Sequence, residues 1–286
     1  RAEGAPARGP ASPGRDASDK IEITVEANPN DCVPDTLGAL RAAGVNRLSI
    51  GTQAFDDAGL VFLGRDHSAR DSLSAVAVAR AAGFANLSVD LIYALPGRDS
   101  AAWPATLACA LAESPEHLSV YELTVEKRTT FGARRRKGEL VPVDDEVAAR
   151  EHERAHEVLS AAGYTHYEVS SYARPDREAR HNSLYWHGGA YLGLGAGAHS
   201  FLPRGAGGVR WSTHRSVVRY FREVGKVGAR LEGDALVAEL DQLDADKRRA
   251  EALWLGLRTH KGVPAEWLEA RAPALAPADF GATVLA

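Results

Sequence analysis

The stretch Asn86-Leu87-Ser88-Val89-Asp90-Leu91-Ile92-Tyr93 decides the fold of this chain. Apolar residues alternate in it with small or polar ones, and Leu95-Pro96-Gly97 closes the run, as expected of a strand that ends in a turn. Helices are predicted on both sides of it, at 68–82 and at 100–112. A strand placed between two helices predicts one βα unit of a parallel sheet.

The same alternation of strands and helices continues in both directions along the chain. Further strands are predicted at 21–27, 47–53, 117–124 and 167–172, and further helices at 34–43, 56–63 and 145–162. Units that recur at roughly 30-residue spacing predict an α/β fold with a parallel sheet, either a barrel, part of a barrel or a doubly wound sheet. No strand is followed by a G-x-G-x-x-G turn, which argues against a dinucleotide-binding fold.

The polar positions of the predicted strands share one face of the sheet. They are Glu22, Thr24 and Glu26, then Ser49, Gly51 and Gln53, then Asn86, Ser88 and Asp90. A partly open barrel with a wet, ligand-holding lumen would show this pattern, whereas a closed barrel filled with branched side chains would not. The alternative is a sheet with one face in solvent, which is rare for parallel strands.

Composition excludes several classes of function. A net charge of -4 and a pI near 6.2 give no reason to expect nucleic acid as a partner. No apolar run approaches the ~18 residues of a transmembrane segment, and the first residues do not show a basic-then-apolar signal-peptide pattern, so a cytoplasmic location is predicted. The two cysteines, Cys32 and Cys109, are too few for a disulfide framework, a zinc site or an iron–sulfur cluster. Cys109 is predicted to lie in the core, and Cys32 to be an incidental loop thiol.

Three regions are predicted along the chain. Residues 1–20, rich in Gly, Pro and Ala, are expected to be disordered, and residues 21–200 to form the barrel core. Residues 201–286 are predicted to be a C-terminal region with the start of a truncated helical domain, including an amphipathic helix at 239–257. Arg134 to Lys137 are predicted to be a solvated loop, and His152, His156 and His166 to lie on the surface.

Four strand-end motifs carry a family resemblance. They are Val25-Glu26-Ala27-Asn28-Pro29, Arg47-Leu48-Ser49-Ile50-Gly51-Thr52-Gln53-Ala54-Phe55, Leu63-Gly64-Arg65-Asp66-His67, and Val89 to Gly97 (VDLIYALPG). In order and spacing they resemble the radical-SAM family of haem chaperones (HemW) and oxygen-independent coproporphyrinogen oxidases, from about Ile21 to about Gly262. The resemblance implies a partial, open radical-SAM (β/α) barrel of parallel strands with a small helical C-terminal appendage.

The resemblance also implies ligands. In that family S-adenosylmethionine lies across the strand ends, so Glu26 would contact its methionine part, and Gln53 and Arg65 its carboxylate and ribose. Asp90 would bind the ribose hydroxyls, and Thr124 would line the adenine. For Arg65, a surface salt bridge with Asp66 is the alternative.

The segment His181-Asn182-Ser183-Leu184-Tyr185-Trp186 resembles the HNxxYW motif of the haem-chaperone branch. A histidine beside Tyr and Trp at helical spacing offers an iron ligand next to flat aromatic surface. The resemblance thus implies a haem segment containing His181 as a candidate iron ligand, Asn182, Tyr185 and Trp186, with His199 nearby. The alternative is that His181, like most lone helical histidines, is structural.

The family's cluster motif, C-x3-C-x2-C, does not occur in this chain. The chain begins with Arg1 and contains no methionine, so an N-terminally truncated fragment is predicted. The full-length parent is expected to hold a 4Fe-4S cluster, S-adenosylmethionine and haem, and to pass haem to unknown acceptor proteins. The alternative activity is oxygen-independent oxidation of coproporphyrinogen III, and a third possibility is a fragment without activity. Without the cluster cysteines, this chain is not expected to perform radical chemistry.

Overall fold

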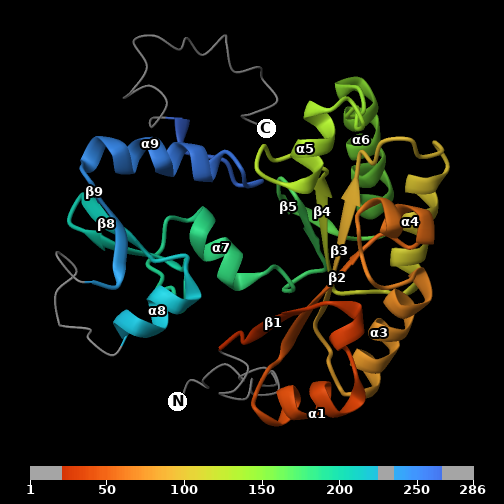
Figure 1. The fold of residues 1–286 in the computed structure, drawn as a ribbon, viewed down its shortest axis with the longest axis horizontal. Coiled ribbons are helices and arrows are strands. Elements are labelled where there is room, and N and C mark those ends of the chain that lie inside the picture. The colour runs from red at the N-terminus through yellow and green to blue at the C-terminus, as the bar shows by residue number, and fades with distance from the viewer. Residues whose placement is uncertain (1–20, 225–234, 266–286) are drawn as a thin grey trace, which may run out of the picture.

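The computed structural model describes residues 21–224 and 235–265 and contains two sheets (Figure 1). The larger has the order β1-β2-β3-β4-β6-β5. Its strands are β1 (Thr24–Ala27), β2 (Arg47–Gln53), β3 (Leu87–Tyr93), β4 (His117–Glu122), β5 (Thr165–Glu168) and β6 (Ser171–Ala173). The first four run parallel, as the sequence predicts, and the intervening helices are α1 (Pro34–Ala42), α2 (Asp57–Phe62), α3 (Ala69–Ala81), α4 (Ala102–Ala112) and α6 (Asp145–Ala161).

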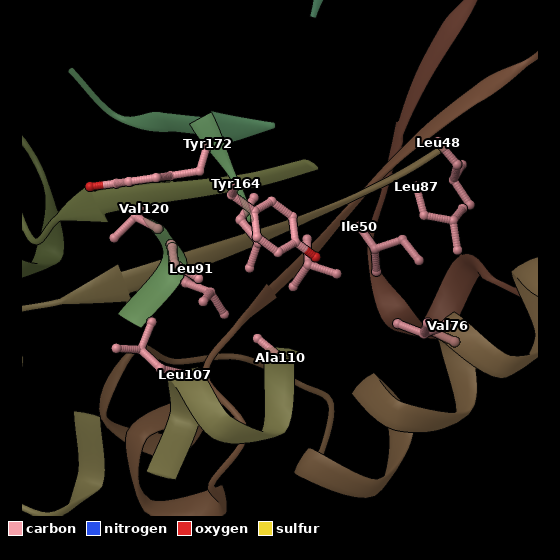
Figure 2. Packing of buried hydrophobic residues seen from close by; sticks show 14 of the residues in the cluster. Leu48, Ile50, Val76, Leu87, Leu91, Leu107, Ala110, Val120, Tyr164 and Tyr172 are labelled. Atoms are coloured by element: carbon pink, nitrogen blue, oxygen red, sulfur yellow. The ribbon is translucent and has the colours of Figure 1, made fainter. Parts of the chain in front are cut away.

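The apolar face of this sheet forms the core. Leu48, Leu87 and Leu91 have no exposed surface, and Figure 2 shows them turned toward Val76 on α3 and Leu107 on α4. Because alternate strand residues point to opposite faces, the same strands present their polar residues to the other side. The prediction of an apolar face covered by helices and an inner polar face is therefore confirmed for β2 and β3.

Local signals fix the ends of the helices. Ser68 and Asp71 form a capping box at the start of α3, in which the Ser68 hydroxyl accepts from the backbone N–H of Asp71 and the Asp71 carboxylate accepts from that of Ser68. The helix ends before Gly83, whose φ of 85° is a conformation that glycine adopts without strain.

The prediction of a single fifth strand at 167–172 is wrong, because two short strands take its place. The chain turns at Val169–Ser170, where the Glu168 carboxylate accepts from the backbone N–H of Ser170 at 3.2 Å. The two short strands β5 and β6 therefore make an antiparallel hairpin, and β6 pairs antiparallel with β4. The sheet is mostly parallel, with an antiparallel edge.

The predicted loop at 134–137 is also wrong, because a helix α5 (Thr130–Arg136) covers most of it. Thr129 starts this helix by accepting from the backbone N–H of Gly132 at 3.1 Å. The Arg134 guanidinium then lies 5.6 Å from the ring centre of Phe62 and 5.7 Å from that of Phe131. Aromatic contacts thus hold a basic segment that looks like solvated loop in the sequence.

The C-terminal region is more than a helical appendage. Strands β7 (His199–Arg204), β8 (Gly207–Thr213) and β9 (Val237–Leu243) form an antiparallel sheet, accompanied by α7 (Arg180–Trp186), α8 (Val217–Val224) and α9 (Ala245–Gly256). The helix predicted at 239–257 begins only at Ala245, because Asp244 caps it through the backbone N–H of Lys247 at 2.8 Å. The predicted boundary after residue 200 falls inside β7. Residues 1–20 lie outside the described part of the chain.

No helix in the described residues is both long and apolar enough to cross a bilayer.

Candidate functional site

A polar cleft of about 650 Å³ lies on the inner face of the large sheet. Strands β1 to β4 and the start of α7 line it, and Figure 1 shows α7 between the two sheets. The lining residues are Glu22, Ile23, Thr24, Glu26, Arg47, Ser49, Asp90, Ser119, Tyr121, Ala179, His181 and Asn182. The polar face that the strand pattern predicts is therefore the wall of a hollow and not a flat solvent-exposed surface.

Asp90 is the carboxylate at the centre of this wall. The Ser49 hydroxyl donates to it at 3.2 Å. Burial raises the pKa of the Asp90 carboxyl above its ordinary value, while hydrogen bonds from Ser119 and Ser49 and the charge of Arg47 act in the opposite direction. A ligand that donates a further hydrogen bond to Asp90 would therefore stabilise its ionised form.

A buried polar chain connects the sheet to the start of α7. The His117 ring contacts the Ser88 hydroxyl through Nδ1 and the Tyr167 hydroxyl through Nε2, both at 2.8 Å, and Tyr167 accepts from the backbone N–H of Ala179 at 3.2 Å. A neutral imidazole has one donor and one acceptor nitrogen, which matches two hydroxyl neighbours. Burial, and secondarily the charge of Arg47, lowers the pKa of His117 well below its ordinary value.

Glu22 holds α7 from the other side. Its two carboxylate oxygens accept the backbone N–H groups of Arg180 and His181, each at 3.2 Å. These donors belong to the first turn of a helix and have no partner within it. The contact joins residues 158 positions apart and places His181 in the cleft wall.

We expect Glu22→Ala to lower the free energy of unfolding by about 1 kcal/mol, because two charge-assisted hydrogen bonds to a helix start are lost. Urea denaturation measures this change, and amide hydrogen exchange should accelerate over 180–186. Glu139→Ala is the control. Glu139 is exposed and its carboxylate lies 3.9 Å from the ammonium group of Lys137, a long surface ion pair, so its loss should change stability little. Equal effects of the two variants would contradict a specific role for Glu22.

The far side of α7 is aromatic. His181 Nε2 and the Tyr185 hydroxyl lie 2.7 Å apart, and the Tyr185 ring meets Tyr191 edge to face with centres 4.6 Å apart. The Arg258 guanidinium lies 4.4 Å from the ring centre of Trp186, and Arg248 donates to the carbonyl of Gly188 at 3.0 Å. The last turn of α7 is therefore held by α9 and the segment that follows it.

The structure separates the predicted site residues into two groups. Glu26, Asp90, His181 and Asn182 line the cleft. The others lie outside the lining set: Gln53 is buried at the end of β2 with a φ of 65°, Arg65 and Trp186 are half-buried, Tyr185 stands behind His181, and Thr124 and His199 are exposed.

Sequence reasoning missed several lining residues, of which Arg47, Ser119 and Tyr121 carry polar side chains. Strand parity could have found Arg47, because it lies two residues before Ser49 on the same face. Ser119 and Tyr121 likewise alternate along β4.

Of the three histidines predicted to be on the surface, His156 is exposed, whereas His152 and His166 are half-buried. The His166 ring stacks on Tyr172 with centres 4.3 Å apart and lies 5.9 Å and 5.3 Å from the rings of His152 and His156. Burial, and secondarily the charge of His156, lowers the pKa of His152; burial also lowers the pKa of His166, against the hydrogen bond to the Val169 carbonyl. Across residues 21–224 and 235–265, no three His, Cys, Asp or Glu side chains are arranged to hold a metal ion.

The cysteines do not fit an iron–sulfur cluster. Contrary to prediction, Cys32 is buried in the core and Cys109 is only partly buried, on α4. Burial raises the pKa of the Cys32 thiol to about 11, which disfavours the thiolate that ligates iron. Cys109 lies on a helix that packs against the apolar face, away from the cleft.

Comparison with known proteins agrees with this architecture. Residues 8–109 match the model of the radical SAM superfamily. The chain is 38% identical over 267 residues to "Radical S-adenosyl methionine domain-containing protein 1, mitochondrial" of Bos taurus, covering 92% of this chain and 59% of the relative. It is 37% identical over 243 residues to "Heme chaperone HemW" of Mycobacterium tuberculosis, covering 85% and 60%.

The fold agrees as well. The structure of the coproporphyrinogen III oxidase HemN of Escherichia coli, a radical SAM enzyme, superimposes with a TM-score of 0.68 and 22% identity, covering 85% of this chain and 56% of that one. The chain is thus similar in sequence to HemW-like radical SAM proteins and similar in fold to HemN. Its large sheet is the corresponding partial, open barrel of the HemN fold. This HemW-like chain spans about 60% of the length of the curated relatives that it matches.

Proposed function

We propose that this HemW-like protein binds haem and S-adenosylmethionine in the polar cleft and delivers haem to an acceptor protein. The observation that carries the proposal is that one cleft contains Glu26 and Asp90 together with His181 and Asn182. The first pair belongs to the strand-end motifs and the second to the HNSLYW segment, so two separate sequence signals meet in one hollow.

The cleft suits S-adenosylmethionine chemically. Asp90 and Glu26 offer carboxylate oxygens to ribose hydroxyls and to the ammonium group of the methionine part. We assign the carboxylate and remaining ribose contacts to Gln53 and Arg65, and the adenine contact to Thr124. When bound beside a reduced cluster, S-adenosylmethionine is a source of radicals; the described residues of this chain do not fit such a cluster, so its role here is binding.

For haem, His181 supplies the imidazole. It lies on the cleft wall, and in the described structure its Nδ1 makes no hydrogen bond while Nε2 is engaged by Tyr185. In the same segment, Asn182 supplies an amide at the cleft wall, Tyr185 orients the His181 ring from behind, and we assign the Trp186 ring a supporting role. His199 is a second exposed imidazole in the C-terminal region.

The test is a haem titration followed by Soret absorbance. We expect saturable binding by the unaltered chain and at least about tenfold weaker binding by His181→Ala, a loss of about 1.4 kcal/mol or more, since the imidazole that would ligate the iron is removed. His187→Ala is the matched control, because His187 lies one residue past the same helix and contacts the Ser183 carbonyl at 2.6 Å outside the cleft. Equal affinity in all three proteins would refute the assignment of His181.

The acceptor protein, a cytoplasmic location and the absence of nucleic-acid binding remain predictions. The alternative activity, oxidation of coproporphyrinogen III, rests on likeness of fold alone. No cleft residue favours it over haem binding.

A further inference from the structure

Arg47 is a buried cation at the floor of the cleft. It is the first residue of β2, opposite Thr24 of β1, and its side chain lines the cleft beside Ser49. Only 5% of the residue is exposed.

The Arg47 guanidinium has no bonded partner in the described structure. It forms no ion pair or side-chain hydrogen bond with residues 21–224 or 235–265, and its buried Nε has no acceptor. Other partly buried arginines are paired: Arg80 with Glu116 at 2.9 Å and Arg210 with Glu251 at 2.8 Å. A buried charge is normally paired and hydrogen-bonded, because its desolvation is otherwise uncompensated.

The nearest acidic groups do not fill this role. Asp90 lies close enough for the two charges to interact, yet its carboxylate takes its hydrogen bonds from Ser49 and Ser119 and forms no ion pair with Arg47. Glu22 is occupied by the backbone of α7. Arg47 is thus a set of free donors inside a cavity large enough for a ligand.

We propose that Arg47 anchors a carboxylate group of the molecule that occupies the cleft, an inference that rests on the proposed function and extends it. A guanidinium fork matches the two oxygens of a carboxylate. Glu22, Glu26 and Asp90 line the same cleft, and these acidic side chains disfavour a multiply charged phosphate and favour a singly charged carboxylate on a ligand with other donors. Two proposed ligands offer that group: the propionates of haem and the amino-acid carboxylate of S-adenosylmethionine.

Arg47→Gln tests the inference, with Arg128→Gln at an exposed position as the control. Each protein is titrated with haem, haem dimethyl ester, S-adenosylmethionine and 5′-methylthioadenosine, the second and fourth of which lack the carboxylate. If Arg47 binds a haem propionate, Arg47→Gln weakens haem binding about tenfold or more and leaves the affinity for the dimethyl ester unchanged. If the amino-acid carboxylate is bound, the same loss appears for S-adenosylmethionine and not for methylthioadenosine. Unchanged affinities for all four overturn the inference.

A second measurement separates this inference from the proposed function. Thermal unfolding of the ligand-free proteins is followed in succinate and in sodium chloride at equal ionic strength. We expect succinate to raise the melting temperature of the unaltered chain and of Arg128→Gln, but not of Arg47→Gln. If haem and S-adenosylmethionine both fail to bind, the proposed function fails, and the succinate result still decides: a shift that needs Arg47 supports the anchor, and no such shift rejects it.

Discussion

Replacement of Leu118 by alanine is expected to lower the free energy of unfolding by about 3 to 5 kcal/mol, the range for a large-to-small change at a fully buried site. Leu118 has no exposed surface and lies near the start of β4, paired with Val89 of β3 on one side and Tyr172 of β6 on the other. Strands on both sides fix its surroundings, so the space that the side chain leaves can collapse only in part (Figure 2 shows the packing around Tyr172).

Urea denaturation of Leu118→Ala measures this loss, and Leu194→Ala is the matched control, because Leu194 is 82% exposed. The control should change stability by less than about 0.5 kcal/mol. A loss below about 1 kcal/mol for Leu118→Ala would mean that β4 is not at the centre of the core. Since Ser119 and Tyr121 on the same strand line the cleft, ligand binding should weaken together with stability in this variant.

Acidification from pH 7 to pH 5 is expected to destabilise the protein, with His117 as a main cause. Burial lowers the pKa of His117 well below 6.5. In this pH range the imidazole therefore binds a proton in the unfolded chain but stays neutral in the folded protein. The contribution of His117 to the free energy of unfolding is fully present above pH 6.5 and is lost as the pH falls toward the pKa of His117 in the folded protein. One such proton corresponds to at most about 1.4 kcal/mol per pH unit.

The free energy of unfolding, measured against pH for the unaltered chain and for His117→Gln, checks this expectation. Glutamine can still bond to a neighbouring hydroxyl but does not titrate, so its profile should be flatter below pH 6.5. His152 and His166 act in the same direction as His117, and Asp90, whose folded pKa is raised, acts in the opposite one. Both proteins retain these groups, so parallel profiles would mean that His117 does not titrate differently on folding.

The sequence predicts the parallel part of the fold well, because the information is local there. Alternation over 47–53 and 86–93 marks strands, and the helices between them have caps such as Ser68 that can be read from neighbouring residues. The hairpin at 165–173 could not be predicted, because its strands are too short to show an alternation of apolar and polar residues. Strand β9 escapes because its acidic residues resemble the exposed face of the helix that follows.

The candidate site is predictable only as far as strand parity reaches. Glu26 and Asp90 meet in the cleft because both occupy inward positions on neighbouring strands. The placement of His181 beside them depends on Glu22 and on the chain from Ser88 through His117 to Tyr167, contacts between residues far apart in sequence. No local pattern encodes them, and the unpaired state of Arg47 can be seen only in three dimensions.

The two ends of α7 are held by different layers of the molecule, and this makes the helix a mechanical link. Glu22 and the Tyr167 hydroxyl fix its start to the large sheet, whereas Arg248 and Arg258 fix its end to the C-terminal region. Arg258 also reaches Glu168 on β5 at 3.4 Å. A displacement of α7 would therefore strain its contacts with the large sheet at one end and with the C-terminal region at the other.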